Sequence, residues 1–161
     1  MSEPAGTGAS EPSVAAISHI GLSVADLEAA VEFWTRVMGF RVTTRLPTLC
    51  FVVDVAARVG IGLTDHGGDV RGAFDERHTG LDHLALAVPD TAALQAWAAR
   101  LDELAIPNSG VVETEAGWHL NLRAPDHFPL ELFVIAPAAA EAFGLASPEE
   151  AVAGSQLRPG S

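Results

Sequence analysis

The chain of 161 residues is poor in basic side chains and in cysteine, and it has no tyrosine. Nine Lys and Arg residues stand against 21 Asp and Glu residues. The resulting formal net charge of −12 argues against nucleic acids and anionic membrane surfaces as partners. The single cysteine, Cys50, excludes an internal disulfide and fits a reducing compartment. Apolar runs long enough to span a bilayer are also lacking, so we expect a soluble, cytoplasmic protein.

The two ends of the chain differ in composition from the stretch between them. Residues 1–14 are rich in Gly, Ser, Pro and Glu and lack the regions of a signal peptide, so we expect a disordered leader. Residues 137–161 are expected to form a flexible tail with one helical turn around Glu141. Apolar residues make up 48% of the chain, which is enough for the core of a single domain at 15–136.

A stretch in the second half of the chain, LDHLALAVPD at 81–90, repeats a stretch in the first half, SHIGLSVAD at 18–26. In both copies a histidine opens a short apolar run that stops at an aspartate, and a helical pattern of apolar residues follows. The two aspartates, Asp26 and Asp90, are suited to cap these helices. We therefore predict two copies of one βα unit. The predicted segments are module one at about 15–66, a glycine-rich connector at 67–80 and module two at about 81–136.

Each copy continues with segments whose alternating apolar residues are typical of strands. For module one we expect a strand at 17–24, a helix at 27–38, and strands at 40–45, 48–55 and 58–64. For module two we expect a strand at 81–88, a helix that ends before Pro107, and strands at 110–113, 118–123 and 128–135. The predicted fold class is α+β, with two tandem βαβββ modules that form a curved mixed sheet around a metal-binding cavity and helices on the outside.

Small residues accompany the histidine on one face of each repeated strand. This face carries Gly21 and Ser23 in the first copy and Ala85 and Ala87 in the second. The opposite faces carry Leu, Ile and Val, which are suited to pack against helices. Because small residues beside a histidine leave space, we predict that both histidines line a shared cavity.

A carboxylate occupies the corresponding face of the last strand of module two. In PLELFVI, Glu131 alternates with leucines, and its burial there is unfavourable without a partner. Two imidazoles and one carboxylate form the ligand set of a facial-triad metal site with open positions. His19, His83 and Glu131 are therefore the predicted ligands of a divalent metal ion. Residue type does not select among Fe, Mn, Zn, Ni and Co.

Further site residues follow from strand alternation and from nearby aromatic side chains. His119 is expected to face the cavity beside Glu131 and to act as a general acid or base. A partly exposed histidine at a strand end is the alternative interpretation. The residues expected to line the substrate pocket are Asn121, Arg123, Phe51, Trp118 and Phe133.

The order of these motifs resembles the vicinal oxygen chelate superfamily, which includes glyoxalase I, bleomycin-resistance, fosfomycin-resistance and extradiol-dioxygenase proteins. The resemblance covers about 17–135 and rests on the pair HIGLSVAD and HLALAVPD and on the segment APDHFPLEL. It implies two βαβββ modules, edge to edge around one divalent metal held by His19, His83 and Glu131. It also implies a small-molecule substrate and a homodimer.

Two departures from the family pattern bear on the activity. Matching IGLTD with LELFV puts Gly62 opposite Glu131, so the fourth ligand of glyoxalase I and epimerase members is missing. The lack of tyrosine leaves the tyrosine of extradiol dioxygenases and fosfomycin enzymes without a counterpart. We expect a metalloenzyme with glyoxalase-like lyase or isomerase chemistry, Fe(II) dioxygenase chemistry or thiol transfer, in that order. The alternative is a non-catalytic, bleomycin-resistance-like protein that sequesters a drug or metabolite.

Overall fold

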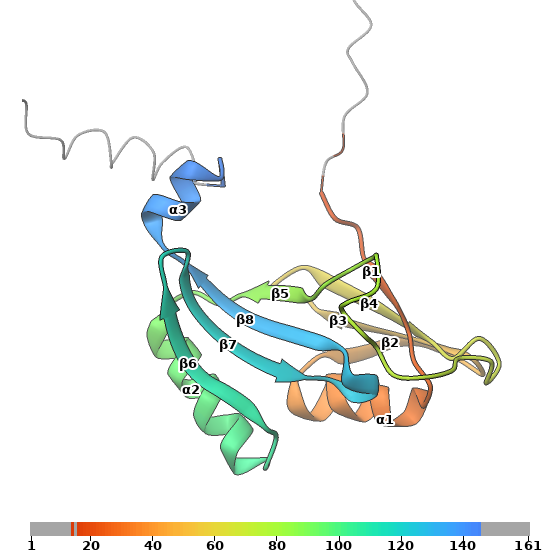
Figure 1. The fold of residues 1–161 in the computed structure, drawn as a ribbon. Coiled ribbons are helices and arrows are strands. Elements are labelled where there is room, and N and C mark those ends of the chain that lie inside the picture. The colour runs from red at the N-terminus through yellow and green to blue at the C-terminus, as the bar shows by residue number, and fades with distance from the viewer. Residues whose placement is uncertain (1–13, 15, 146–161) are drawn as a thin grey trace, which may run out of the picture.

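The computed structural model of the chain describes residues 14 and 16–145 (Figure 1). Nearly all of the expected leader and the end of the expected tail lie outside the described residues. The described residues form two four-stranded sheets with few helices, which confirms the predicted α+β fold of two repeated modules.

Module one forms the first of these sheets. Its elements are β1 (Ile20–Ser23), α1 (Leu27–Glu32), η1 (Phe33–Val37), β2 (Arg41–Leu46), β3 (Leu49–Asp54) and β4 (Val59–Thr64). The strand order is β1-β4-β3-β2, with β1 parallel to β4 and the other pairs antiparallel. The carboxylate of Asp26 accepts a hydrogen bond from the backbone N–H of Ala29 at 3.0 Å, which confirms the predicted helix cap.

Module two repeats this arrangement. Its elements are β5 (Leu84–Ala87), α2 (Thr91–Glu103), β6 (Asn108–Thr114), β7 (Gly117–Arg123), η2 (Pro125–His127) and β8 (Pro129–Ile135), and α3 (Pro137–Ala142) follows. The strand order is β5-β8-β7-β6, and again only the first pair is parallel. Asp90 caps α2 by accepting from the N–H of Ala93 at 2.7 Å, as predicted.

The helix expected at 27–38 forms, but its second half widens into the π-helix η1. The N–H of Met38 donates to the carbonyl oxygen of Phe33, five residues back, at 3.2 Å. The hydroxyl of Thr35 donates to the carbonyl oxygen of Val31 at 2.7 Å. Such side-chain bonds to the backbone compete with the regular helical ladder and favour local widening.

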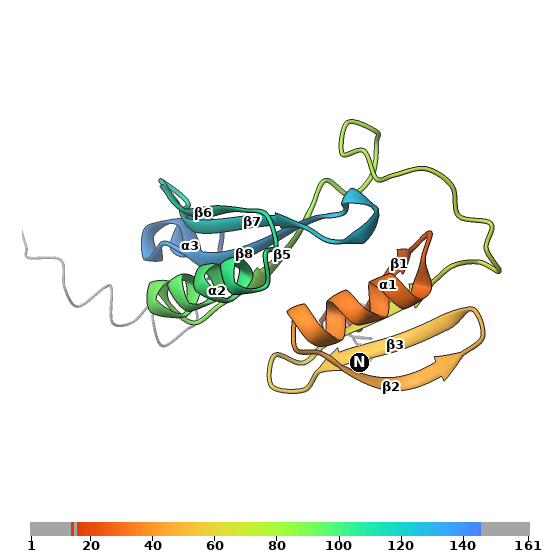
Figure 2. The same ribbon diagram turned by 90° about the horizontal axis from the view of Figure 1, so that it is seen from below.

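One hydrophobic core joins the two modules through their helices. Figure 2 shows α1 and α2 on the sides of the modules that face each other, and Arg100 of α2 donates to the carbonyl oxygen of Val37 at 3.0 Å. The strand residues that are buried in this core are Cys50, Val52, Ile61, Leu63, Leu120, Leu122, Leu130 and Leu132. Because side chains alternate along a strand, the opposite face of each sheet points away from the core.

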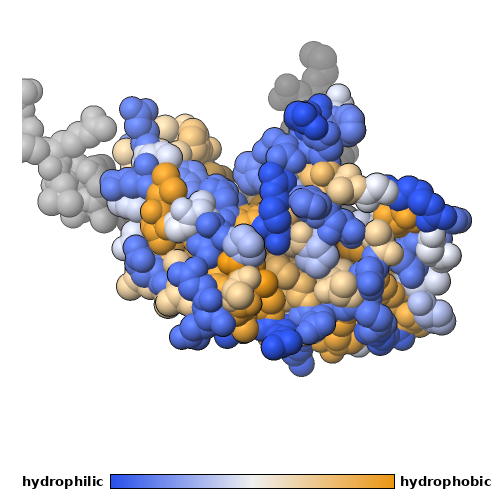
Figure 3. All heavy atoms as spheres, turned by 60° about the horizontal axis from the view of Figure 1, so that its bottom comes forward, coloured by the Kyte–Doolittle hydropathy of each residue, from blue (hydrophilic) through white to orange (hydrophobic). Residues whose placement is uncertain are grey.

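The strands β1 and β5 each have only one neighbour within the described sheets, so each leaves an edge free. Two apolar residues at equivalent positions before these strands, Ile17 and Leu81, are 79% and 50% exposed. On the helix side of the molecule, apolar patches are interrupted by hydrophilic side chains (Figure 3). None of the helices in the described part of the chain is long and apolar enough to cross a membrane.

Candidate functional site

His83 and Glu131 meet on the face of the module-two sheet that points away from the core. Strand β5 runs parallel to β8 with Ala85 opposite Glu131, so the histidine just before β5 lies beside the carboxylate. The Nε2 atom of His83 is 3.6 Å from Oε2 of Glu131. This distance is longer than a hydrogen bond, and it leaves both atoms available to a common ligand.

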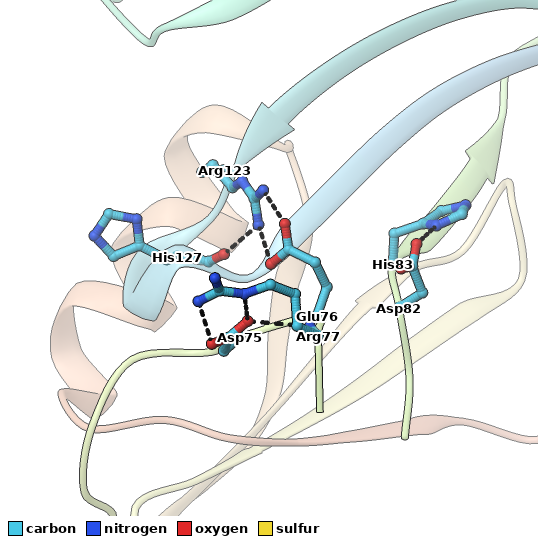
Figure 4. Close-up of polar contacts among 7 residues, drawn as sticks. All are labelled: Asp75, Glu76, Arg77, Asp82, His83, Arg123 and His127. Atoms are coloured by element: carbon cyan, nitrogen blue, oxygen red, sulfur yellow. Dashed lines mark hydrogen bonds and ion pairs between the residues drawn. The ribbon is translucent and has the colours of Figure 1, made fainter. Parts of the chain in front are cut away.

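The carboxylate of Asp82 orients the ring of His83 (Figure 4). Its Oδ1 lies 2.6 Å from Nδ1 of His83. An Nδ1–H that donates to this carboxylate leaves the lone pair of Nε2 directed toward Glu131. A carboxylate behind the far nitrogen is a recurring feature of histidines that bind metals.

Glu131 is largely buried, with 13% of its side chain exposed. Its Oε1 accepts from Nδ1 of His119 at 2.6 Å, and the ring of His119 is tilted over Phe133 at 4.7 Å between centroids. The structure therefore brings His119 and Phe133 together with Glu131. The two oxygens of this carboxylate have different surroundings, since only Oε2 faces His83.

His19 occupies the equivalent position in module one. Its Nδ1 lies 2.9 Å from the hydroxyl oxygen of Ser18, and its ring contacts the ring of Phe51 edge-on at 5.8 Å between centroids. Within residues 14 and 16–145, no group of three His, Cys, Asp or Glu side chains is arranged to hold a metal. A single chain thus pairs His83 with Glu131 but does not add His19 to them.

The register of the two sheets supports the predicted match between Gly62 and Glu131. In module one Gly62 pairs with Gly21 on the first strand, as Glu131 pairs with Ala85 in module two. The ring of Phe51 lies over Gly62, 3.5 Å from the place that a Cβ atom would occupy. Module one therefore offers an aromatic ring where module two offers a carboxylate.

Arg123 ties the connector to module two (Figure 4). Its guanidinium donates to both carboxylate oxygens of Glu76, at 2.6 and 3.1 Å, and to the carbonyl oxygen of His127 at 3.0 Å. The hydrogen bond from Arg123 lowers the pKa of Glu76 to about 2. The hydrogen bond from Arg77 likewise lowers the pKa of Asp75 to about 2.

The remaining pocket candidates on β7 lie on opposite faces of their sheet. Asn121 is exposed and pairs directly with Glu131 across the sheet. Trp118 alternates in phase with Leu120 and packs against the core. The structure therefore does not bring Trp118 to the face that carries His119, because neighbouring residues of a strand point in opposite directions.

Three polar residues of this site are absent from the sequence-based predictions. Ser18 and Asp82 each precede one of the repeated histidines, and their equivalent positions in the repeat are a signal that could have identified them. The third is Thr114, whose hydroxyl oxygen lies 2.7 Å from Nε2 of His119. Its contact depends on the register of β6 against β7, which local sequence does not reveal.

Comparisons with known proteins agree with this fold. Residues 16–132 match the sequence model of the Glyoxalase/Bleomycin resistance protein/Dioxygenase superfamily. A glyoxylase/bleomycin resistance protein/dioxygenase domain from Frankia sp. EAN1pec is 26% identical, with a TM-score of 0.65 over 81% of this chain and 99% of that chain. A comparison with curated protein sequences found no match.

Two more distant structures share the fold. Lactoylglutathione lyase from Agrobacterium tumefaciens is 24% identical, with a TM-score of 0.62 over 74% of this chain and 93% of that chain. The fosfomycin resistance protein FosX from Mesorhizobium loti is 17% identical, with a TM-score of 0.57 over 77% of this chain and 95% of that chain.

Proposed function

Because this chain belongs to the Glyoxalase/Bleomycin resistance protein/Dioxygenase superfamily, we propose that it is a divalent-metal enzyme acting on a small molecule with vicinal oxygens. The observation that carries this proposal is the approach of His83 Nε2 to Glu131 Oε2 at 3.6 Å. Two ligand atoms about 2.1 Å from one ion lie about 3.0 to 3.4 Å apart, so the pair needs little adjustment to bind it. Asp82 and His119 already hold the other polar atoms of the pair.

The third ligand, His19, is proposed to come from a second copy of the chain. The faces that carry His19 and His83 point away from the core, and the edges of β1 and β5 are free. A homodimer that joins the β1 edge of one copy to the β5 edge of the other would bury the exposed side chains of Ile17 and Leu81. It would also bring His19 of each copy to the acidic site of the other.

When bound, the ion supplies a Lewis acid with open positions for two substrate oxygens. The chain provides one carboxylate that faces Nε2 of His83, and Gly62 provides none on the opposite module. This difference disfavours a proton shuttle between two carboxylates. The proposed reaction is lyase or isomerase chemistry, with Fe(II) dioxygenase chemistry second and thiol transfer third.

Metal analysis of the untagged protein, purified without chelator, tests the proposal. We expect one divalent ion per chain in the wild type and its loss in His83→Ala and Glu131→Gln. Hemithioacetals and catechols are then assayed with and without dioxygen, and turnover should require the bound ion. A metal-free wild-type protein that also gains no ion on dialysis against Mn²⁺, Fe²⁺, Co²⁺, Ni²⁺ or Zn²⁺ would refute a metalloenzyme.

A second candidate function is the sequestration of an apolar small molecule without turnover. A cavity of about 350 Å³ between β1, the connector and η2 favours it. The aromatic side chains that line this cavity are Trp34, Phe74 and Phe128. Ligand binding that persists in both His83→Ala and Glu131→Gln, together with absence of turnover, would select this function over the first.

A further inference from the structure

His119 is held on three sides within module two. Its Nδ1 lies 2.6 Å from Oε1 of Glu131, and its Nε2 lies 2.7 Å from the hydroxyl oxygen of Thr114. The same hydroxyl donates to the carbonyl oxygen of Gly117 at 3.2 Å. The ring face rests on Phe133. Because 19% of the side chain is exposed and both nitrogens have partners, the ring cannot turn without breaking a contact.

The contact with His119 makes the two oxygens of Glu131 unequal. A free carboxylate binds a cation through one oxygen, through the other, or through both, and it rotates between these modes. The hydrogen bond to His119 occupies Oε1, so Oε2 is the oxygen that faces His83 at 3.6 Å. The carboxylate is thereby oriented before any ligand arrives.

Module one lacks both partners of this contact. Gly62 stands at the position of Glu131. Leu49 stands at the position of His119, because Leu49 pairs with Thr64 as His119 pairs with Phe133. The His119 imidazole and the Glu131 carboxylate thus occur together in module two and are both lacking in module one. This joint occurrence indicates that the imidazole acts on the carboxylate.

We propose that His119 is a positioning residue that retains Oε1 of Glu131, so that Oε2 alone is presented toward His83 for a divalent ion. This inference rests on the proposed metal-binding function and extends it to a residue that does not touch the ion. Thr114 has the supporting role of fixing the ring. Hydrogen bonds of this kind, behind a ligating side chain, change metal affinity by about 10- to 100-fold.

Three substitutions of His119 separate the hydrogen bond from the packing. His119→Phe keeps a ring over Phe133 but removes both nitrogens. His119→Asn places an amide N–H near the position of Nδ1, whereas His119→Gln reaches toward the position of Nε2 and Thr114. His78→Phe removes an exposed connector histidine, and it serves as the matched control for the loss of one imidazole.

Calorimetric titration with Mn²⁺ and visible absorption of the Co²⁺-loaded protein provide the readouts. We expect His119→Phe and His119→Gln to bind Mn²⁺ about 10- to 100-fold more weakly than wild type, with unchanged stoichiometry. His119→Asn should recover most of the affinity and the wild-type Co²⁺ spectrum. His78→Phe should match wild type in both measurements.

The outcomes distinguish this inference from the proposed function. If His119→Phe and His119→Gln bind Mn²⁺ like wild type, His119 does not position Glu131, while the metal site itself stands. The same conclusion holds if folded His119→Asn is as weak as His119→Gln. If His119→Phe does not fold, the difference in Mn²⁺ affinity between His119→Asn and His119→Gln tests the inference. A wild-type protein that binds none of Mn²⁺, Fe²⁺, Co²⁺, Ni²⁺ and Zn²⁺ would overturn both proposals.

Discussion

The two modules pair their strands in matching register, yet they place different side chains on the sheet face that points away from the core. In module two this face carries Glu131 with His119 bonded to it, beside His83. In module one it carries Phe51 lying over Gly62, beside His19. The backbone is therefore duplicated, but the carboxylate is not.

This difference agrees with the proposed site, in which module two supplies the acidic half and module one supplies its complement. Each module has a histidine whose Nδ1 is engaged by the residue before it, Ser18 or Asp82. Among the described residues, the sheet face beside the histidine carries a largely buried carboxylate in module two, where module one has Gly62. In the proposed site, one copy of each module therefore supplies the ligands for one ion and not for two.

The largest expected effect is the recovery of metal binding when two variants that each bind metal poorly are mixed. His19→Ala and Glu131→Gln should each lose metal affinity by about 1,000-fold, or about 4 kcal/mol. If the modules that complete a site come from different chains, exchanged heterodimers contain one intact site each. A one-to-one mixture should then recover about a quarter of the wild-type metal content. No recovery after verified subunit exchange would contradict a site completed by His19 of a second chain.

Alanine substitutions of one glycine in each sheet should lower the free energy of unfolding by different amounts. A Cβ atom on Gly117 would collide with the backbone of β8, and this residue has a φ of +143°. A Cβ atom on Gly60 would come too close only to the Phe51 ring, at 2.9 Å, and would be in ordinary contact with the Cβ atom of His19 at 3.7 Å. We expect Gly117→Ala to lower the free energy of unfolding by about 3 to 5 kcal/mol. Gly60→Ala should lower it by about 1 kcal/mol, since the ring can move.

Urea denaturation of both variants measures these values. Equal losses of stability in the two variants would show that the Phe51 ring beside Gly60 is as rigid as the β8 backbone beside Gly117.

Gly62→Glu should make module one more like module two. The substituted side chain would start in ordinary contact with Phe51, so we expect the fold to persist. An added carboxylate on the opposite module should tighten Mn²⁺ binding by about tenfold, or about 1.4 kcal/mol. Gly62→Gln has the same size without the charge and is the control. Equal affinities in the two variants would show that residue 62 does not reach the ion.

The smallest effect concerns the attachment of the connector to module two. The pKa of Glu76 is lowered from 4.5 to about 2 by its hydrogen bond from Arg123, so this contact favours the folded state above pH 4.5. The contribution is lost as the pH falls from 4.5 toward 2. Hydrogen exchange of residues 67–80 should therefore accelerate, relative to the intrinsic rate, across this range. Glu76→Gln should exchange faster at neutral pH and lack this acid dependence.

Much of the fold could be predicted because its signals are local. Alternation along the strands identified the faces of β1, β5 and β8, and the aspartates before both helices act as the predicted caps. The same alternation places Trp118 on the core face, so its assignment to the pocket neglected a rule that the sequence already contained. The widening of the helix at η1 accompanies a hydrogen bond from the Thr35 hydroxyl to the backbone, which the apolar pattern does not report.

Residue order and type alone establish the duplication, the equivalence of His19 with His83, and the presence of Glu131 in module two where module one has Gly62. Tertiary structure decided which of these groups meet. The pairing of β5 with β8 brings His83 to Glu131, and the pairing of β6 with β7 brings Thr114 to His119. The packing of α1 and α2 into one core turns both histidine faces outward. The first of these contacts joins residues far apart in the chain, and the second depends on the register of one hairpin, so neither follows from residue order and type alone.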